Sequence, residues 1–544
     1  MTAGEAPAVA PASEARSGAG IVLFTLAAGQ FLMTLDSSVM NVSIATVAKD
    51  VGTTVTGIQG AITAYTLVMA ALMITGGKIG GIIGRKRAFA IGCVIYGAGS
   101  LTTSLAPNLP VLLLGWSFLE GVGAALILPA IVALVAGNFP VARRPAAYGM
   151  VAAAGAVAVA VGPLIGGFCT TYFSWRWVFA GEVVVVLIIL LLTRRIADAP
   201  VETRPKLDIV GAVLSAAGLA LIVYGVLRSG VWGWITPKAG QPSWAGLSPT
   251  VWFVLGGVFV LWCFSHWQRH RERTGKEPLI RPGFLRNRQL GGGLTMFFFQ
   301  FLVQAGFFFV IPLFLSVVLG LSALATGARL LPLSFSLLAA AIGIPRFAPN
   351  ISPRLVVRSG LLSLVAGTVV LLAALDPTSG AEVVFIPLLL VGAGIGALAS
   401  QLGAVTVSAV PDEESPEVGG VQNTMTNLGA SLGTAIAGSI LFGTLTSAFL
   451  TNIQNNPAIP DRVKSQATTK ITGSVPFVSD ADLEAALNEQ HLSSKTTDAA
   501  ISSYQEARIT GLKSALAILA LMALIALFLA QLIPKKQPAA ARAP

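Results

Sequence analysis

The sequence predicts an all-α integral membrane protein with fourteen transmembrane helices, and three observations support this prediction. Hydrophobic residues make up 54% of the 544 residues and charged residues only 11%, whereas a soluble domain carries about 25% charged residues. Apolar stretches of the ~20 residues that a bilayer-spanning helix needs recur along the chain. Basic residues gather in every second connection, which is typical of cytoplasmic loops.

The candidate spans, taken in order, have the approximate bounds 20–45, 57–80, 88–106, 110–136, 146–169, 176–193, 209–228, 249–266, 290–312, 325–344, 358–375, 383–405, 418–443 and 511–533. A middle pair followed by a basic loop indicates two six-helix halves around a two-helix insert. The predicted organisation is a disordered cytoplasmic tail (1–19), an N-terminal half (20–193), an insert with basic cytoplasmic loops (194–289), a C-terminal half (290–533) with an outer loop (446–509), and a cytoplasmic tail (534–544).

Two segments outside the predicted spans have a local signature. The outer loop is expected to contain an amphipathic helix from about Ser479 to Gln490, with Ser479 as its N-cap, because a serine hydroxyl accepts a hydrogen bond from the first helical turn. Residues 1–20 are rich in Ala, Pro, Ser and Gly and lack the basic stretch and short apolar core of a secretory signal. We expect this segment to be disordered.

The distribution of charge predicts the orientation. With a cytoplasmic N-terminus, the inner loops collect most basic residues: Arg85, Lys86, Arg87, Arg143, Arg144, Arg194, Arg195, Arg204, Lys206, Arg269, Arg271, Arg273, Lys276, Arg281, Arg286, Arg288, Arg346, Arg354, Arg358, Lys535 and Lys536. The outer connections offer only Lys49, Arg176, Arg228, Lys238 and Arg329. Both termini are therefore expected in the cytoplasm, with the protein in the cell (plasma or inner) membrane. The asymmetry explains most of the net charge of +11, so we expect no nucleic-acid partner.

No pattern indicates an enzyme, a metal site or a cofactor. The sequence contains no phosphate-binding loop, so an ATP-driven mechanism is not expected. The histidines, His266, His270 and His491, have no partners at metal-ligand spacing. Cys93, Cys169 and Cys263 lie far apart in apolar stretches and form no disulfide or metal framework.

Five motifs occur in a fixed order along the spans. They are Leu35–Ile44 (LDSSVMNVSI), Gly77–Arg87 (GKIGGIIGRKR), Gly162–Gly167 (GPLIGG), Ser174–Phe179 (SWRWVF) and Gly429–Ala435 (GASLGTA), with Trp232-Gly233-Trp234 in the insert. In this order the chain resembles the major facilitator superfamily, in its fourteen-helix branch of drug:proton antiporters. The resemblance covers nearly the whole chain and implies export of drugs against inward proton flow.

The resemblance also implies two structural roles. Gly162, Pro163, Gly166 and Gly167 would form a gating contact between the halves, since they leave a thin, kinked helix face that another helix can approach. Ordinary small-residue packing is the alternative. A cytoplasmic latch would be formed by Gly77, Gly84, Arg85, Lys86 and Arg87, although any inner loop is basic.

The chain departs from the family pattern at several positions. Gly81 and Ile82 replace the acidic and basic residues of the latch. In the fourth span Ser117 stands where the family has an arginine, and Glu120 stands where it has a glutamine. Glu182 replaces a common asparagine, and Thr426 and Asn427 replace an Arg-Gln pair.

Three acids lie within the predicted spans, where an ionisable group is expensive and therefore a functional candidate. Asp36 is near the bilayer midplane, Glu120 near the middle of the fourth span and Glu182 nearer the outer end of the sixth. No basic residue lies deep in this half, so a carboxylate there would readily take up a proton. We assign these acids to proton coupling and cation recognition. The structural alternatives are that Asp36 caps or hydrogen-bonds a neighbouring helix, that Glu120 hydrogen-bonds Ser117 or Trp116, and that Glu182 reaches the outer interface or pairs with Arg176.

Four further residues are predicted to line a central cavity. Met33 and Met40 share the face of Asp36, and Gln300 and Gln304 share one face of a phenylalanine-rich span. Acids from one half and amides plus aromatics from the other suit a large, apolar, often cationic molecule.

The predicted function is secondary active export of lipophilic, cationic compounds, such as drugs or toxic metabolites, in exchange for protons. The expected partners are this small-molecule substrate, protons and membrane lipids, and the sequence is compatible with a monomer. A lipid or glycolipid exporter of the same fold and a non-transporting membrane receptor or scaffold are the alternatives.

Overall fold

A computed structural model describes residues 14–140, 143–198, 206–238, 240–410, 415–470, 475–489 and 493–536. Across these ranges the chain is helical, apart from turns and an isolated bridge between Trp244 and Leu247. Thirteen helical segments among the described residues are long and apolar enough to cross a membrane. The predicted third span is also a helix, α3 (Arg85–Ser104), but it carries too many polar residues to join those thirteen. The all-α membrane fold is therefore confirmed.

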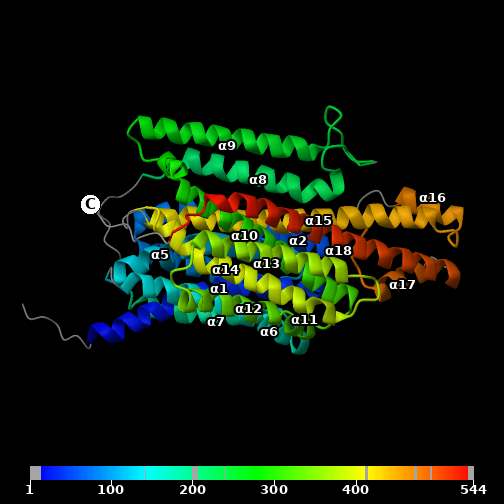
Figure 1. Cartoon of the computed structure of the whole chain (residues 1–544), viewed down its shortest axis with the longest axis horizontal. Helices are drawn as coiled ribbons and strands as arrows, with labels where there is room; N and C mark the ends of the chain where they lie inside the picture. The colour runs from blue at the N-terminus through cyan, green and yellow to red at the C-terminus, as the bar shows by residue number, and fades with distance from the viewer. Residues whose placement is uncertain are drawn as a thin grey trace, which may run out of the picture.

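The first eight elements of the bundle correspond to the predicted N-terminal half. They are α1 (Glu14–Asp50), α2 (Val55–Ile83), α3 (Arg85–Ser104), α4 (Leu109–Leu112), the π-helix η1 (Leu113–Glu120), α5 (Gly121–Asn138), α6 (Arg144–Tyr172) and α7 (Arg176–Thr193), where α4, η1 and α5 form one continuous span. The insert comprises α8 (Ile209–Trp232) and α9 (Pro249–Arg273). These two helices lie side by side along one edge of the bundle (Figure 1), and α8 also contacts α2 and α15.

The remaining elements correspond to the predicted C-terminal half. They are η3 (Pro282–Arg286), α10 (Arg288–Leu313) with η4 (Phe314–Val318), α11 (Ala323–Arg329), α12 (Leu331–Phe347), α13 (Pro353–Ala374), η5 (Ala381–Val384), α14 (Phe385–Val407), α15 (Ser415–Asn455), α16 (Asp461–Lys470), α17 (Asp480–Asn488), α18 (Ser494–Leu529) and η7 (Ala530–Leu532). The division of the chain into the predicted domains stays a prediction.

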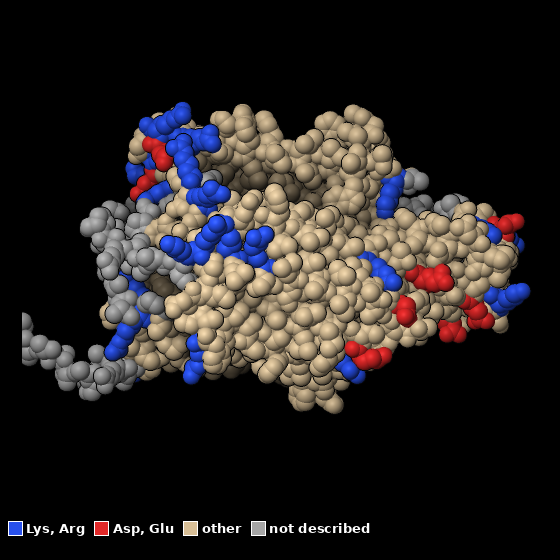
Figure 2. All heavy atoms as spheres, viewed as in Figure 1, with Lys and Arg blue, Asp and Glu red and all other residues tan. Residues whose placement is uncertain are grey.

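The predicted outer loop is largely helical. The ends of α15 and α18 project beyond the other helices, together with α16 and α17 (Figure 1). The expected N-cap is confirmed, since Ser479 Oγ accepts a hydrogen bond of 3.2 Å from Asp482 N at the start of α17. On the visible face, acidic residues gather on this projecting end, whereas lysines and arginines dominate the opposite end (Figure 2).

Parts of the predicted tails and loops are outside the described residues. These are residues 1–13 of the predicted N-terminal tail, residues 537–544 of the C-terminal one, and Arg204, Gln490 and His491. The helix α1 begins at Glu14, within the predicted tail.

Candidate functional site

The three predicted intramembrane acids meet in the interior of the bundle. Asp36 of α1, Glu120 of η1 and Glu182 of α7 each place a carboxylate oxygen within 4.8 Å of the oxygens of the other two. Their exposed fractions are 0%, 0% and 2%. Three separate candidates in the sequence are therefore one site, which we call the acid cluster.

Asp36 is held by an aromatic pair. Both of its carboxylate oxygens accept a hydrogen bond from Trp116 Nε1, at 2.8 and 2.9 Å. The Trp116 ring in turn stacks on Tyr65 of α2, with 5.0 Å between the ring centroids. Trp116 lies four residues before Glu120, so both side chains leave the same face of η1. This spacing is the signal that could have identified Trp116 from the sequence.

Hydroxyl groups of α3 hold the two glutamates. Thr103 Oγ1 donates to Glu120 Oε1 at 3.1 Å, and Glu182 Oε2 accepts from Ser100 Oγ at 3.0 Å and Tyr96 Oη at 3.2 Å. The second oxygens, Glu120 Oε2 and Glu182 Oε1, are buried without a hydrogen-bond partner among the described residues. The polar residues that make α3 less apolar than the other spans therefore donate the hydrogen bonds to Glu120 and Glu182.

Among the described residues, the two glutamates do not hydrogen-bond the partners that the structural alternatives named for them. Ser117 Oγ donates instead to the carbonyl of Ala61 at 2.8 Å, and Trp116 binds Asp36. Arg176 pairs with Asp50 at 3.2 Å and does not reach Glu182. The alternative for Asp36 does occur, because it hydrogen-bonds a neighbouring helix.

Glycines allow α3 to pack closely on η1. A Cβ at Gly99 would lie 2.6 Å from Glu120 Cγ, and one at Gly115 would lie 2.7 Å from Thr103 Oγ1. Either contact would push the two helices apart. Glu120 also ends a π-helical segment, a departure from α-helix that is frequent at functional sites.

No basic side chain of the described residues pairs with the acid cluster. No ion pair that the structure describes involves Asp36, Glu120 or Glu182. Three carboxylates this close in a low-dielectric interior cannot all be ionised, because like charges repel strongly there. The arrangement can therefore bind protons or a cationic group. Carboxylate oxygens also suit a hard metal ion, although the sequence predicts none.

The predicted cavity residues are buried in the described structure. Met33 and Met40 lie on α1, and Gln300 and Gln304 lie on α10, which contacts α1. The carbonyl oxygens of both glutamine side chains have no hydrogen-bond partner among the described residues. Their role as cavity lining stays a prediction.

The predicted gating residues lie where α6 meets α1 and α11. A Cβ at Gly166 would lie 2.9 Å from Val39 Cα, and one at Gly167 would lie 2.5 Å from the carbonyl oxygen of Ala323. Gly162 faces Ser38 in the same way, and a Cβ at Gly327 would press on the Pro163 carbonyl. The motif thus joins the two predicted halves.

A second contact between the predicted halves involves α2 and α15. Gln59 Nε2 donates to the Thr434 carbonyl at 2.9 Å, and Ser431 Oγ donates to the Thr63 carbonyl at 2.9 Å. Ser431 and Thr434 belong to the glycine-rich run of α15 that the sequence singled out. Gln59 was not identified from the sequence. A polar amide within an otherwise apolar span is the signal that could have indicated this contact.

The predicted latch is built from different partners than its motif implies. Arg85 donates to the carbonyl of Gly77, and the backbone N–H of Lys86 donates to Asp198 at 3.0 Å. Gly84 has a φ of 101°, which favours glycine. The family's latch motif has an acidic residue where this chain has Gly81. Asp198, which follows α7, thus supplies a carboxylate to the latch from another part of the chain. Arg87 is exposed.

Another carboxylate, Asp208, joins the two helices of the insert, α8 and α9. It caps α8 by accepting from Gly211 N, and it accepts from Trp267 Nε1 and Gln268 Nε2, both at 2.9 Å. Burial raises its pKa, but these hydrogen bonds and the charge of Arg271, 3.7 Å away, outweigh burial and hold the pKa of Asp208 below its usual value.

Gln268 continues this connection into the loop after α9. Its side-chain oxygen accepts from the backbone N–H of Leu279 at 2.6 Å. Leu279 belongs to a buried apolar cluster with residues of α2, α10 and α15, among them Ile74, Leu294 and Val418. The loop therefore contacts both predicted halves at the end of the bundle opposite to α17.

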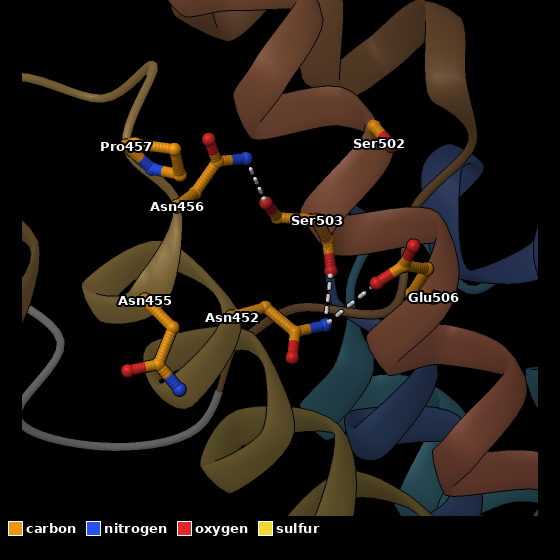
Figure 3. Close-up of a pocket in the computed structure, with 7 residues that line it drawn as sticks. All are labelled: Asn452, Asn455, Asn456, Pro457, Ser502, Ser503 and Glu506. Atoms are coloured by element: carbon orange, nitrogen blue, oxygen red, sulfur yellow. Dashed lines mark hydrogen bonds between the residues drawn. The ribbon is translucent and has the colours of Figure 1, made fainter.

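One open pocket lies on the projecting end, away from the acid cluster. It measures about 340 Å³, and polar side chains of α15 and α18 line it (Figure 3). Asn452 donates to Ser503 O at 3.1 Å, and Asn456 donates to Ser503 Oγ at 3.3 Å. These bonds tie the two helix ends together.

The architecture defines a class of protein. A multi-pass helical bundle with glycine-rich contacts between its predicted halves, and with an intramembrane carboxylate site in one of them, is typical of a secondary transporter. Residues 26–434 match the sequence profile of the Major Facilitator Superfamily, so the chain belongs to this family. It is a membrane transporter and not an enzyme.

The curated relatives carry names of drug resistance and export proteins. The chain is 31% identical over 443 residues to the puromycin resistance protein pur8 of Streptomyces alboniger, covering 80% of this chain and 84% of that protein. It is 27% identical over 479 residues to the multidrug efflux pump LfrA of Mycolicibacterium smegmatis, covering 88% and 90%. These matches confirm the resemblance to the multidrug efflux branch.

Solved structures support the fold. A bacterial homologue of the human lysosomal transporter Spinster, in an inward-facing and unoccupied conformation, matches with a TM-score of 0.58 at 16% identity, covering 95% of this chain and 98% of that one. The human organic anion transporter MFSD10 matches with a TM-score of 0.54 at 13% identity, covering 94% and 99%.

Proposed function

We propose that this transporter exports lipophilic, cationic compounds in exchange for protons, with both termini in the cytoplasm. The observation that carries the proposal is the acid cluster, three buried carboxylates without a basic partner among the described residues. Such a site can bind either a proton or an organic cation. Binding of one therefore disfavours binding of the other, which is the requirement for antiport.

The proposed cycle uses Asp36 and Glu120 as the competing groups. When the site faces the cytoplasm, the deprotonated carboxylates attract the cation, and the aromatic pair of Trp116 and Tyr65 adds apolar surface. When the site faces outward, protonation removes the attraction and the substrate leaves. Glu182, held by α3, supplies the third exchangeable position.

Alternating access would require the contacts between the predicted halves to open and close in turn. The contacts of α6 with α11 and of α2 with α15 would separate for outward release. The loop contact at Leu279 would separate for cytoplasmic entry. Rocking of one half against the other around a fixed midplane site is the usual way for such folds to do this.

A lipid or glycolipid exporter is the second candidate. The helical projection of α15 to α18 favours it, because it extends the transporter beyond the membrane surface on one side. The two candidates differ in whether a soluble amine competes for the site.

Reconstituted vesicles provide the test. Puromycin is a suitable first substrate, because it is an amine and a relative is named for resistance to it. We expect a pH gradient to drive puromycin transport and puromycin to release protons from the purified protein at constant pH. Transport without either effect would overturn proton exchange, and absence of puromycin binding together with lipid transfer would favour the second candidate. A protonophore and protein-free vesicles are the controls.

A further inference from the structure

An apolar groove of about 620 Å³ lies outside the acid cluster, between the start of α12 and the start of α14. Leu331 and Phe335 of α12 form one wall, and Val384, Phe385 and Leu389 form the other. At one end stands Arg329, the last residue of α11. The volume is in the range of sites that bind small amphiphilic molecules, about 300–1,000 Å³.

The groove opens toward the lipid-facing surface. Phe335 is 74% exposed and Phe385 is 52% exposed, and both lie near the ends of apolar helices, where aromatic side chains meet the headgroup region. Both helices enter the membrane at this end, after the connections expected on the outer side. An acyl chain of the outer leaflet is the molecule that such a surface meets first.

Arg329 adds a charge to an otherwise apolar surface. Its side chain is exposed, and it forms no hydrogen bond or ion pair with any residue that the structure describes. Guanidinium binds phosphate through parallel N–H···O bonds, so its fork of donors suits a phosphodiester at headgroup level. We propose that the groove binds one anionic phospholipid of the outer leaflet, with an acyl chain between Phe335 and Leu389 and the phosphate on Arg329.

The site borders the contact between the predicted halves. The opposite face of α11 packs on α6, where Gly327 faces the Pro163 carbonyl and Leu324 N donates to Thr171 Oγ1 at 3.0 Å. A bound lipid would thus hold α11 from one side while α6 holds it from the other. Any effect of the lipid on transport rests on the proposed function, but its binding does not.

The test measures lipid binding to purified full-length protein by native mass spectrometry. The probes are phosphatidylglycerol and phosphatidylcholine, added separately after delipidation. We expect Arg329→Gln to weaken phosphatidylglycerol binding about fivefold, the effect of one basic residue on an anionic lipid, and to weaken phosphatidylcholine binding less, because the choline charge offsets the phosphate. Lys49→Gln, which removes another exposed cation expected on the outer side, should change neither.

A second variant tests the acyl-chain wall separately from the charge. Ala328 lines the groove and is exposed, so Ala328→Trp should fill it without disturbing a buried contact. This variant should lose phosphatidylglycerol binding while eluting as a monodisperse peak from size-exclusion chromatography. Equal binding of both lipids by wild type, or unchanged phosphatidylglycerol binding in both variants, would overturn the proposal whatever the vesicle transport assays show.

Discussion

Two buried carboxylate sites in this chain have opposite surroundings. Asp208, at the start of α8, accepts hydrogen bonds from three groups and lies 3.7 Å from Arg271. The acid cluster contains three carboxylates, no described ion pair, and two oxygens without a hydrogen-bond partner among the described residues. Solvent exposure is nearly the same in the two places, since Asp208 is 3% exposed and Asp36 is 0% exposed, although Asp36 lies deeper in the bundle.

The difference separates a structural acid from one available for exchange. A carboxylate whose lone pairs are filled and whose charge is paired gains nothing from a proton or a foreign cation. A carboxylate left partly unpaired in low dielectric gains a large part of its lost solvation energy from either one. Low exposure of an acid is therefore a weaker sign of function than the absence of a neutralising partner.

The largest expected effect is that of Asp36→Asn. The amide keeps the size of the side chain and can still accept from Trp116, but it can neither ionise nor bind a proton. We expect proton-driven export of cationic substrates to be abolished, with vesicles accumulating no more substrate than protein-free ones. Folding should be intact, as judged by elution from size-exclusion chromatography.

The paired control for Asp36→Asn is Asp50→Asn. Asp50 is an acid of the same helix, but it pairs with Arg176 at its exposed end. This variant should keep most of the transport activity. Normal drug accumulation in cells that produce ordinary amounts of Asp36→Asn would rule out the central role of the acid cluster.

A smaller effect is expected for Glu120→Gln. Gln can still accept from Thr103, so the packing of η1 on α3 should be kept. One exchangeable charge is lost, and we expect coupling to weaken by about 1–3 kcal/mol, roughly 5- to 150-fold. The loss should be larger for dicationic than for monocationic substrates.

The pH profile provides the measurement for Glu120→Gln. Wild-type transport should change with external pH between about 5.5 and 8.5, where a proton competes with the substrate. The variant should respond less. Identical profiles for wild type and variant would show that Glu120 is a structural hydrogen-bonding group and would leave Asp36 as the coupling residue.

The fold was predictable because a membrane span is a local property of the sequence. About 20 apolar residues identify a span whatever its neighbours are, and each predicted span coincides with a helix of the structure. The least apolar of these spans, α3, carries a pattern that indicates its role in the site. Tyr96, Ser100 and Thr103 recur at helical spacing and mark the face that meets the glutamates.

The assembly of the site depends on contacts that are distant in sequence. Asp36, Glu120 and Glu182 each follow from the rule that membrane acids are expensive. Their meeting depends on how α1, η1 and α7 pack, and no periodicity encodes this. The same holds for Asp198 at the latch, which is far along the chain from Lys86. A π-helical turn such as η1 also has no sequence signature to distinguish it from α-helix.

The smallest expected effect is that of Asp208→Asn, and it concerns stability instead of transport. Asparagine is as good an N-cap as aspartate, so the cap on Gly211 remains while the charge opposite Arg271 is lost. We expect thermal unfolding in detergent at neutral pH to show a loss of about 1 kcal/mol, the difference between charged and neutral hydrogen bonds. Proton-coupled transport should keep its pH profile.

The pH dependence of this loss follows from the depressed pKa of Asp208, which hydrogen bonds and Arg271 hold down against the effect of burial. A carboxyl whose folded pKa lies below its unfolded value of about 3.9 contributes stability above that value, and the contribution disappears as the pH falls through the folded pKa. The gap between wild type and Asp208→Asn should therefore be complete at neutral pH and should narrow below about pH 4. Glu272→Gln, an exposed acid of α9, is the matched control and should show no gap at either pH. A gap for Asp208→Asn that stayed constant at acidic pH would mean that the charge does not stabilise this site, and an altered transport profile would mean that Asp208 belongs with the acid cluster after all.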